Sequence, residues 1–147
     1  QPVRGDSEHP WRSQRLARQP VSLIATPHLT PPPVFPSALN GHAFILPGVE
    51  NATRHAFDQL CGHYRLTPKI AAEVDDMAMM RLLARDTQHI AVMPPVVVRD
   101  ELHNGTLKDY GALPGVWEEF YAITIQRRFE SPSLKALLTR SGESLLD

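Results

Sequence analysis

Apolar positions in this chain form short runs that alternate with stretches of helical periodicity. The apolar runs, bounded by proline, glycine or polar residues, predict a buried strand at 20–26 and further strands at 42–46, 69–74 and 89–93. Between them, apolar residues recur every three or four positions and predict helices at 52–64 and 77–84, with a shorter helix over 96–103. This order predicts βαβ units, and therefore an α/β fold whose mostly parallel sheet is flanked by helices.

Side chains at the helix starts support this assignment. Asn51 is a good N-cap for the first helix, and Asp75 or Asp76 can cap the second. The second helix carries Met and Leu at most positions from Met77 to Leu83, so we expect it to be mostly buried. The pair Asn104-Gly105 is suited to end the short third helix.

The ends of the chain and the proline-rich segment differ from this core. Residues 1–19 are polar and aperiodic, which predicts a flexible segment. Residues 29–36 contain three consecutive prolines and predict an extended connector, with a proline-recognition ligand as the alternative. Towards the C terminus we expect a weak strand at Leu107–Tyr110, a long strand at Glu118–Gln126 and a helix starting at Ser131 or Ser133.

Composition narrows the function classes. The chain has 147 residues, a formal net charge of −1 and one cysteine. The charge argues against a nucleic-acid-binding surface on this chain. A single cysteine allows no internal disulfide, so we expect a reducing, cytoplasmic setting. No apolar run is long enough for a membrane helix. The first residue is Gln1, and we expect the chain to be part of a longer protein.

Motifs for catalysis or cofactor binding are missing. The glycines are scattered, and Gly-x-Ser-x-Gly and the histidine-based zinc patterns do not occur. His55 and His63 are two helical turns apart, too far to share an ion without a third element. Cys61 lies on an apolar stripe and is interpreted as a core residue. We therefore predict no cofactor, no metal site built on histidine and no catalytic residues.

Candidate binding residues lie where predicted parallel strands end, because open α/β sheets bind ligands at that edge. The first such end offers backbone N–H groups suited to an anion, and the second offers two carboxylates suited to a cation or an amine. The alternative for these carboxylates is helix capping alone. The tentative effector-binding residues are Gly48, Val49, Glu50, Asn51, Val74, Asp75, Asp76, Met93 and Pro94, with Asp75 and Asp76 as possible cation ligands.

The order of segments resembles the effector-binding domain of LysR-type transcriptional regulators. The stretches that carry the resemblance are Phe-Ile-Leu-Pro-Gly at 44–48, Thr-Pro-Lys-Ile-Ala-Ala-Glu-Val-Asp-Asp at 67–76 and Ile-Ala-Val-Met-Pro at 90–94. The tail Val116–Ile123, with Arg127-Arg128 and Ser131-Pro132, looks most like the sodium/proton antiporter transcriptional activator branch. The polar loop 86–89 replaces a stretch that is usually Gly-rich in the family.

The resemblance implies a type II periplasmic-binding-protein-like fold with two lobes around an effector cleft. Residues 41–104 would form the second lobe, and residues 18–40 and 105–147 the returning part of the first. It also implies a small-molecule or ion effector, a small cation if the branch is right. DNA would be bound only through a winged helix-turn-helix that this chain lacks. The family assembles through this domain, and we expect self-association, with apolar edges at Val21–Thr26 and Glu118–Gln126.

Two other hypotheses about the function compete with the interpretation as a sensor domain. One is a fragment of a free-standing periplasmic solute-binding protein with a related fold. The other is a small α/β enzyme in which Asp75, Asp76 and a histidine act as acid and base, supported by nothing beyond nearness in sequence.

Overall fold

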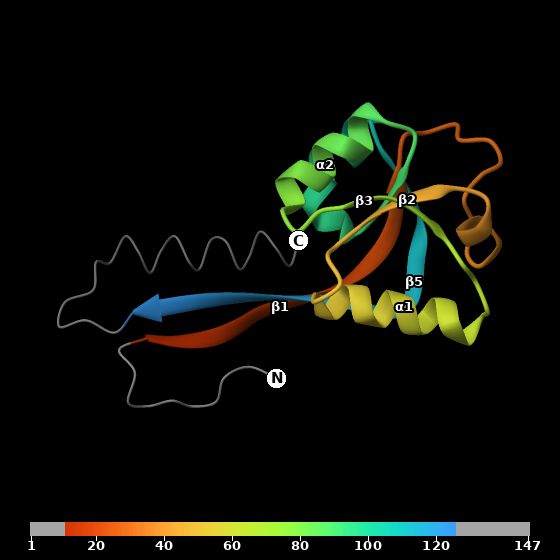
Figure 1. Cartoon of the computed structure of the whole chain (residues 1–147). Helices are drawn as coiled ribbons and strands as arrows, with labels where there is room; N and C mark the ends of the chain where they lie inside the picture. Colours follow the sequence, from red (N-terminus) through yellow and green to blue (C-terminus); the bar gives the residue numbers. More distant parts are fainter. Residues whose placement is uncertain (1–10, 126–147) are drawn as a thin grey trace. The chain divides into compact units, whose positions relative to one another are not determined.

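The structure is a computed structural model, and it describes residues 11–125. Contacts divide the chain into two units, Gln1–Gln19 with Glu119–Asp147 and Pro20–Glu118. The described strands are β1 (Trp11–Ala25), β2 (Ala43–Leu46), β3 (Lys69–Glu73), β4 (Ile90–Met93) and β5 (Lys108–Ile125) (Figure 1). The helices are α1 (Ala52–His63), α2 (Met77–Asp86) and α3 (Arg99–Asn104), with 3-10 turns η1 (Ser37–Asn40) and η2 (Pro95–Val98).

The strands form one mixed sheet in the order β3-β2-β4-β1-β5. β2 pairs in parallel with both β3 and β4, as the alternation of strands and helices predicts. β1 runs antiparallel to β4, with Leu23 opposite Val92. The mostly parallel α/β arrangement is therefore confirmed around β2, and the carboxyl ends of β2, β3 and β4 lie at one edge of the sheet.

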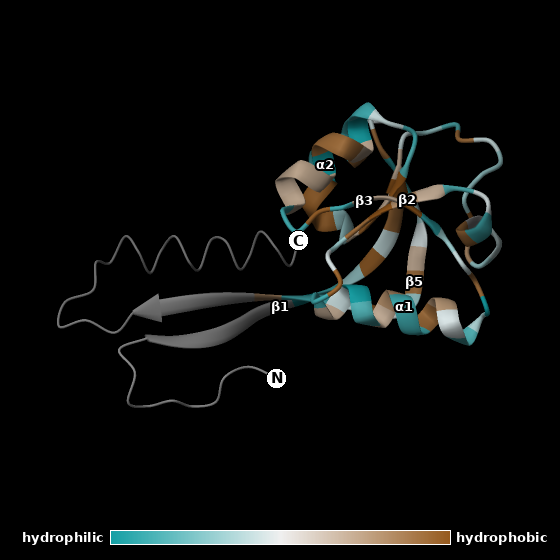
Figure 2. Ribbon diagram, viewed as in Figure 1, coloured by the Kyte–Doolittle hydropathy of each residue, from teal (hydrophilic) through white to brown (hydrophobic). Residues whose placement is uncertain are grey.

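Helices cover both faces of this sheet, α1 on one and α2 on the other (Figure 1). Successive side chains of a strand point to opposite faces, so each buried strand needs apolar residues on both sides. Figure 2 accordingly shows apolar colour along the strands between the helices, whereas α1 is striped. The cluster beneath α1 takes Val21, Leu23, Ala25, Phe44, Leu46, Ile90 and Val92 from the strands. The cluster beneath α2 takes Ile24, Ile45, Ala91 and Met93.

The second helix is less buried than its composition predicts. Only Met80 and Ala84 of α2 are buried, and Met79 is 47% exposed. A helix packed on a sheet buries one stripe, and the short α2 has only that sheet face and the η2 region beneath it. The expectation of a mostly buried helix is therefore wrong.

β5 is one continuous strand from Lys108 to Ile125, where the sequence predicts two. Gly111, Pro114 and Gly115 interrupt the apolar pattern, but they do not end the strand. Glycine and proline weaken a strand without preventing it where the strand lies at the edge of a sheet. β5 is such an edge strand.

β1 also differs from the expectation in two ways. The strand begins at Trp11, inside the segment predicted to be flexible. Its buried part, Val21–Ala25, lies between β4 and β5 and is therefore not an open edge. The expectation of an unpaired apolar edge at Val21–Thr26 is wrong. The last predicted helix, starting at Ser131 or Ser133, lies outside the described residues.

The remaining local predictions agree with the structure. α3 ends at Asn104, and Gly105 takes the left-handed conformation with φ 83°. Residues 29–36 form a connector without a regular helix or strand. Within residues 11–125, no helix has the length and apolar character to cross a membrane.

Candidate functional site

Two strand-to-helix junctions lie side by side at the carboxyl edge of the sheet. The β2–α1 junction comprises residues 47–51, and the β3–α2 junction comprises residues 74–76. Parallel pairing of β2 with β3 brings them together, and the amide of Val74 donates to the carbonyl of Leu46 at 2.8 Å. The predicted residues at 48–51 and those at 74–76 therefore lie on adjoining segments of the surface.

A direct bond joins the two junctions. The amide of Gly48 donates to Oδ1 of Asp75 at 2.9 Å. A Cβ on residue 48 would come within 2.8 Å of that oxygen, so a side chain here would require the exposed Asp75 carboxylate to shift. The Asp75 carboxylate thus lies against the backbone of the β2–α1 junction. The junction therefore has a negative charge beside it.

Most amides of the β2–α1 junction and the helix start already have acceptors. Asn51 caps α1, and its Oδ1 accepts from the amides of Thr53 at 2.7 Å and Arg54 at 3.3 Å. The amide of Asn51 donates to the carbonyl of Gly48 at 3.0 Å, and Gly48 donates to Asp75. The sequence suggests free N–H groups for an anion here, but these four are used internally, and a carboxylate lies beside them.

Capping also accounts for Asp76. Its Oδ1 accepts from the amide of Ala78 at 2.9 Å, and its backbone has the extended geometry of an N-cap. Each aspartate thus uses one oxygen to hold backbone. Both side chains are exposed, so the capping interpretation and cation binding both agree with this geometry.

The other predicted residues divide between surface and core. Val49 and Glu50 are exposed, Val49 by 57%. Met93 is fully buried in the cluster beneath α2 and does not face solvent. Pro94 is buried and precedes η2, whose Val97 amide donates to the Pro94 carbonyl at 3.1 Å.

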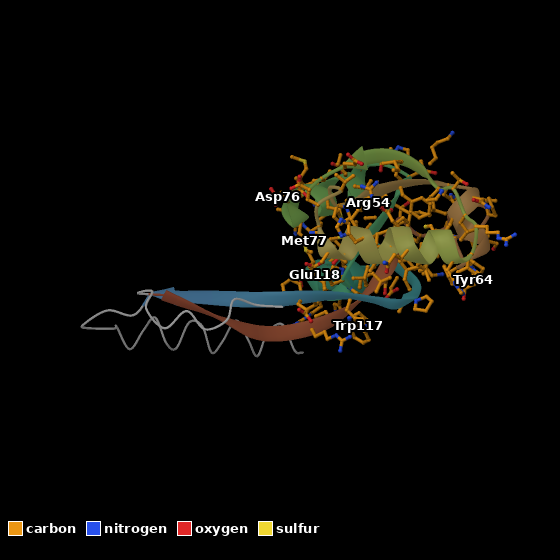
Figure 3. All side chains as sticks on the ribbon, turned by 60° about the horizontal axis from the view of Figure 1, so that its bottom comes forward. Arg54, Tyr64, Asp76, Met77, Trp117 and Glu118 are labelled. Atoms are coloured by element: carbon orange, nitrogen blue, oxygen red, sulfur yellow. The ribbon has the colours of Figure 1, made fainter. Side chains whose placement is uncertain are left out.

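Arg54 contacts both strand ends of the candidate site, and the sequence analysis did not single it out. Its side chain is 7% exposed, yet it carries a charge in the first turn of α1 (Figure 3). Nη1 donates to the Pro47 carbonyl and to Oε2 of Glu73, each at 2.9 Å, and Nε donates to Oδ1 of Asp58 at 3.1 Å. Burial acts to lower the pKa of Arg54, but the bonds to Glu73 and Asp58 outweigh it and the pKa is raised. The guanidinium therefore stays charged.

Thr53 was missed as well. This buried residue donates through Oγ1 towards the carbonyl of Trp117 at 3.2 Å and the carboxylate of Glu118. Figure 3 shows Glu118 near the start of α1 and Tyr64 at its far end.

The burial of Arg54 has a signal in the sequence. Arg54 precedes Phe57 and Cys61 by three and seven residues, so it lies on the same buried stripe of the helix.

The histidine and cysteine predictions can be compared with the structure. Cys61 is 5% exposed in the core, and burial raises the pKa of its thiol to about 11, which suppresses thiolate formation. His55 lies on the surface and pairs its Nε2 with the Val49 carbonyl at 2.7 Å. Among residues 11–125, no three His, Cys, Asp or Glu side chains gather closely enough to hold a metal ion.

Known proteins resemble this chain along nearly its whole length. The family model of the LysR substrate binding domain matches residues 3–145. The transcriptional activator protein NhaR of Escherichia coli K12 is 25% identical over 146 residues, covering 98% of this chain and 48% of that protein. The chain therefore spans about half the length of the curated relatives it matches.

Two solved structures show the same fold. The effector domain of the transcriptional regulator AmpR of Pseudomonas aeruginosa has a TM-score of 0.67 at 18% identity, covering 94% of this chain and 66% of that one. The effector-binding domain of QuiR in complex with shikimate has a TM-score of 0.57 at 18% identity, covering 97% and 69%.

The chain belongs to the LysR substrate-binding domain family. The resemblance stated from the sequence is thereby confirmed, and with it the periplasmic-binding-protein-like α/β fold. The chain holds part of that fold, and its division into lobes at residues 41–104 stays a prediction.

Proposed function

We propose that this chain is the effector-sensing region of a LysR-type DNA-binding transcriptional regulator. It would bind a small molecule or ion and carry out no catalysis. The family match over residues 3–145 carries the proposal. Further support comes from the relative described as a transcriptional activator and from the related effector-binding domain described in complex with shikimate.

In this proposal, effector binding favours one arrangement of the sensor, and self-association passes the change to DNA-binding domains elsewhere in a cytoplasmic regulator. DNA would be contacted by a winged helix-turn-helix and not by these residues. The near-neutral charge of the chain agrees with that division of labour.

The effector would bind at the adjoining β2–α1 and β3–α2 junctions. Exposed Val49 and Glu50 lie on one side, and the carboxylates of Asp75 and Asp76 lie on the other. Because four amides of this surface are engaged and the Asp75 and Asp76 carboxylates lie beside them, the charge favours a cation or an ammonium group over a carboxylate. A small cation also agrees with the resemblance to the sodium/proton antiporter activator branch.

Sodium binding can be tested by thermal unfolding of the chain, and of the complete domain containing it, in sodium chloride against choline chloride. A site at about ten times its Kd raises the free energy of unfolding by about 1.4 kcal/mol. Asp75→Asn and Asp76→Asn remove the charge while keeping an acceptor for the Gly48 and Ala78 amides. We expect either substitution to abolish the sodium-specific rise.

The outcomes separate the alternatives. A sodium-specific rise that both variants retain excludes these carboxylates as the site. No sodium-specific rise in the unmodified chain excludes sodium, and leaves an organic effector at the same junctions to be sought by screening.

A further inference from the structure

Arg54 occupies an unfavourable position for a positive charge. It lies in the first turn of α1, where the helix dipole repels cations, and its side chain is 7% exposed. Removing a charge from water costs free energy unless partners satisfy its hydrogen bonds. A helix surface alone provides only Asp58, four residues further on. The reason for a buried arginine here must therefore lie in its contacts outside the helix.

Those outside contacts are at the two strand ends that carry the candidate site. Pro47 is the first residue after β2, and it has no N–H, so its carbonyl is its whole backbone hydrogen-bonding capacity. Glu73 is the last residue of β3. A single guanidinium nitrogen bonds both at 2.9 Å. The planar, forked group of arginine can do this while Nε bonds Asp58, whereas the single ammonium of lysine has no comparable fork.

We infer that Arg54 is the positioning residue of the effector site, holding the β2–α1 junction against the end of β3. This inference rests on the proposed function only in naming these junctions as the site. Arg54 does not face the effector; it acts through Pro47 and Glu73. The Gly48–Asp75 bond is the next link along the same two segments, and its 2.9 Å length depends on their alignment.

Loss of Arg54 therefore has a local consequence. Without the guanidinium, the junction is held to β3 mainly by the exposed Gly48–Asp75 bond and by the Val74–Leu46 ladder bond. The junction then opens more often, while the sheet beneath it, built on fully buried Phe44 and Leu46, keeps its packing. Local opening of this kind is measured by hydrogen exchange.

The test is hydrogen exchange with mass spectrometry on the full chain, comparing peptides over the β2–α1 junction and over β4. In Arg54→Met we expect exchange over 47–52 to rise about tenfold relative to β4, and in Arg54→Lys to rise by a smaller factor. The matched control is Asp58→Asn, which removes a partner of Arg54 within α1 and should leave the junction unchanged. A merely stabilising Arg54 would raise exchange equally in both peptides.

Glu73→Gln keeps the test decisive if Arg54→Met fails to fold. Glu73 is 46% exposed, so this substitution should be tolerated, and it should raise junction exchange more than Asp58→Asn does. Equal exchange at the junction in Glu73→Gln, Arg54→Lys and the unmodified chain would overturn the inference. That result is independent of the sodium measurement, so the positioning role and the proposed function fail separately.

Discussion

The β2–α1 and β3–α2 junctions have the same local arrangement but differ in how deeply their first helical residues are buried. Each follows a parallel strand and begins a helix with an Asn or Asp cap. At the start of α1, however, Thr53 and Arg54 are buried and reach β5, β3 and the preceding loop. At the start of α2, Asp76 and Ala78 are exposed, and the cap bond is purely local.

This difference shows that a cap pattern marks where a helix begins but not how firmly that beginning is held. α1 covers the larger apolar cluster and also anchors polar contacts from three directions. α2 is attached through a narrow apolar stripe and through the Arg81–Glu101 ion pair at 3.2 Å to α3. We therefore expect α1 to behave as the fixed side of the candidate site and α2 as its more yielding side.

The largest expected effect contrasts the core contacts of the two helices. Phe57 of α1 is fully buried against the ring of Phe44, with centroids 6.0 Å apart. We expect Phe57→Ala to lower the free energy of unfolding by about 3–5 kcal/mol, and Met80→Ala of α2 by about 2 kcal/mol. Urea unfolding monitored by circular dichroism measures both. An equal loss in the two variants would contradict the proposed difference between the helices.

The next effect uses the buried thiol of α1 as a pH-dependent probe. Burial, with a smaller contribution from Asp58, raises the pKa of Cys61 from 9.0 to about 11. The unfolded thiol therefore loses its proton first. The free energy of unfolding therefore keeps its full value, as far as this thiol is concerned, below pH 9. It falls by about 2–3 kcal/mol as the pH rises to about 11. Urea unfolding at several pH values should show this decline in the unmodified chain relative to Cys61→Ala. Parallel pH profiles would refute it.

The smallest effect concerns the caps themselves. Asn51 accepts two amide bonds and is half-buried, whereas exposed Asp76 accepts one. We expect Asn51→Ala to lower the free energy of unfolding by about 1–2 kcal/mol, and Asp76→Ala to lower it by about 0.5 kcal/mol. Differential scanning calorimetry gives both values. Asn51→Asp and Asp76→Asn serve as controls, since each keeps an acceptor at the cap, and a larger loss in Asp76→Ala would reverse the ranking.

Much of the fold could be predicted because its signals are local. The apolar runs gave β2, β3 and β4 to within about two residues, and Asn51, Asp76 and Gly105 marked helix ends as expected. Such features depend on a residue and its next few neighbours. The segments 48–51 and 74–76 lie next to each other, since parallel strands end at one edge, whereas their role as a binding site stays a prediction.

Other features depend on contacts between residues far apart in the chain. Glu73, which accepts from Arg54, lies 19 residues away, and Asp75, which accepts from the Gly48 amide, lies 27 residues away, so no local pattern reveals either contact. The place of β1 inside the sheet and the exposure of α2 likewise depend on which elements pack together. Helix starts and strand positions thus follow from local chemistry. The contacts of Arg54 with Pro47 and Glu73, and the Asp75 carboxylate beside Gly48, arise only when the folded sheet aligns β2 with β3.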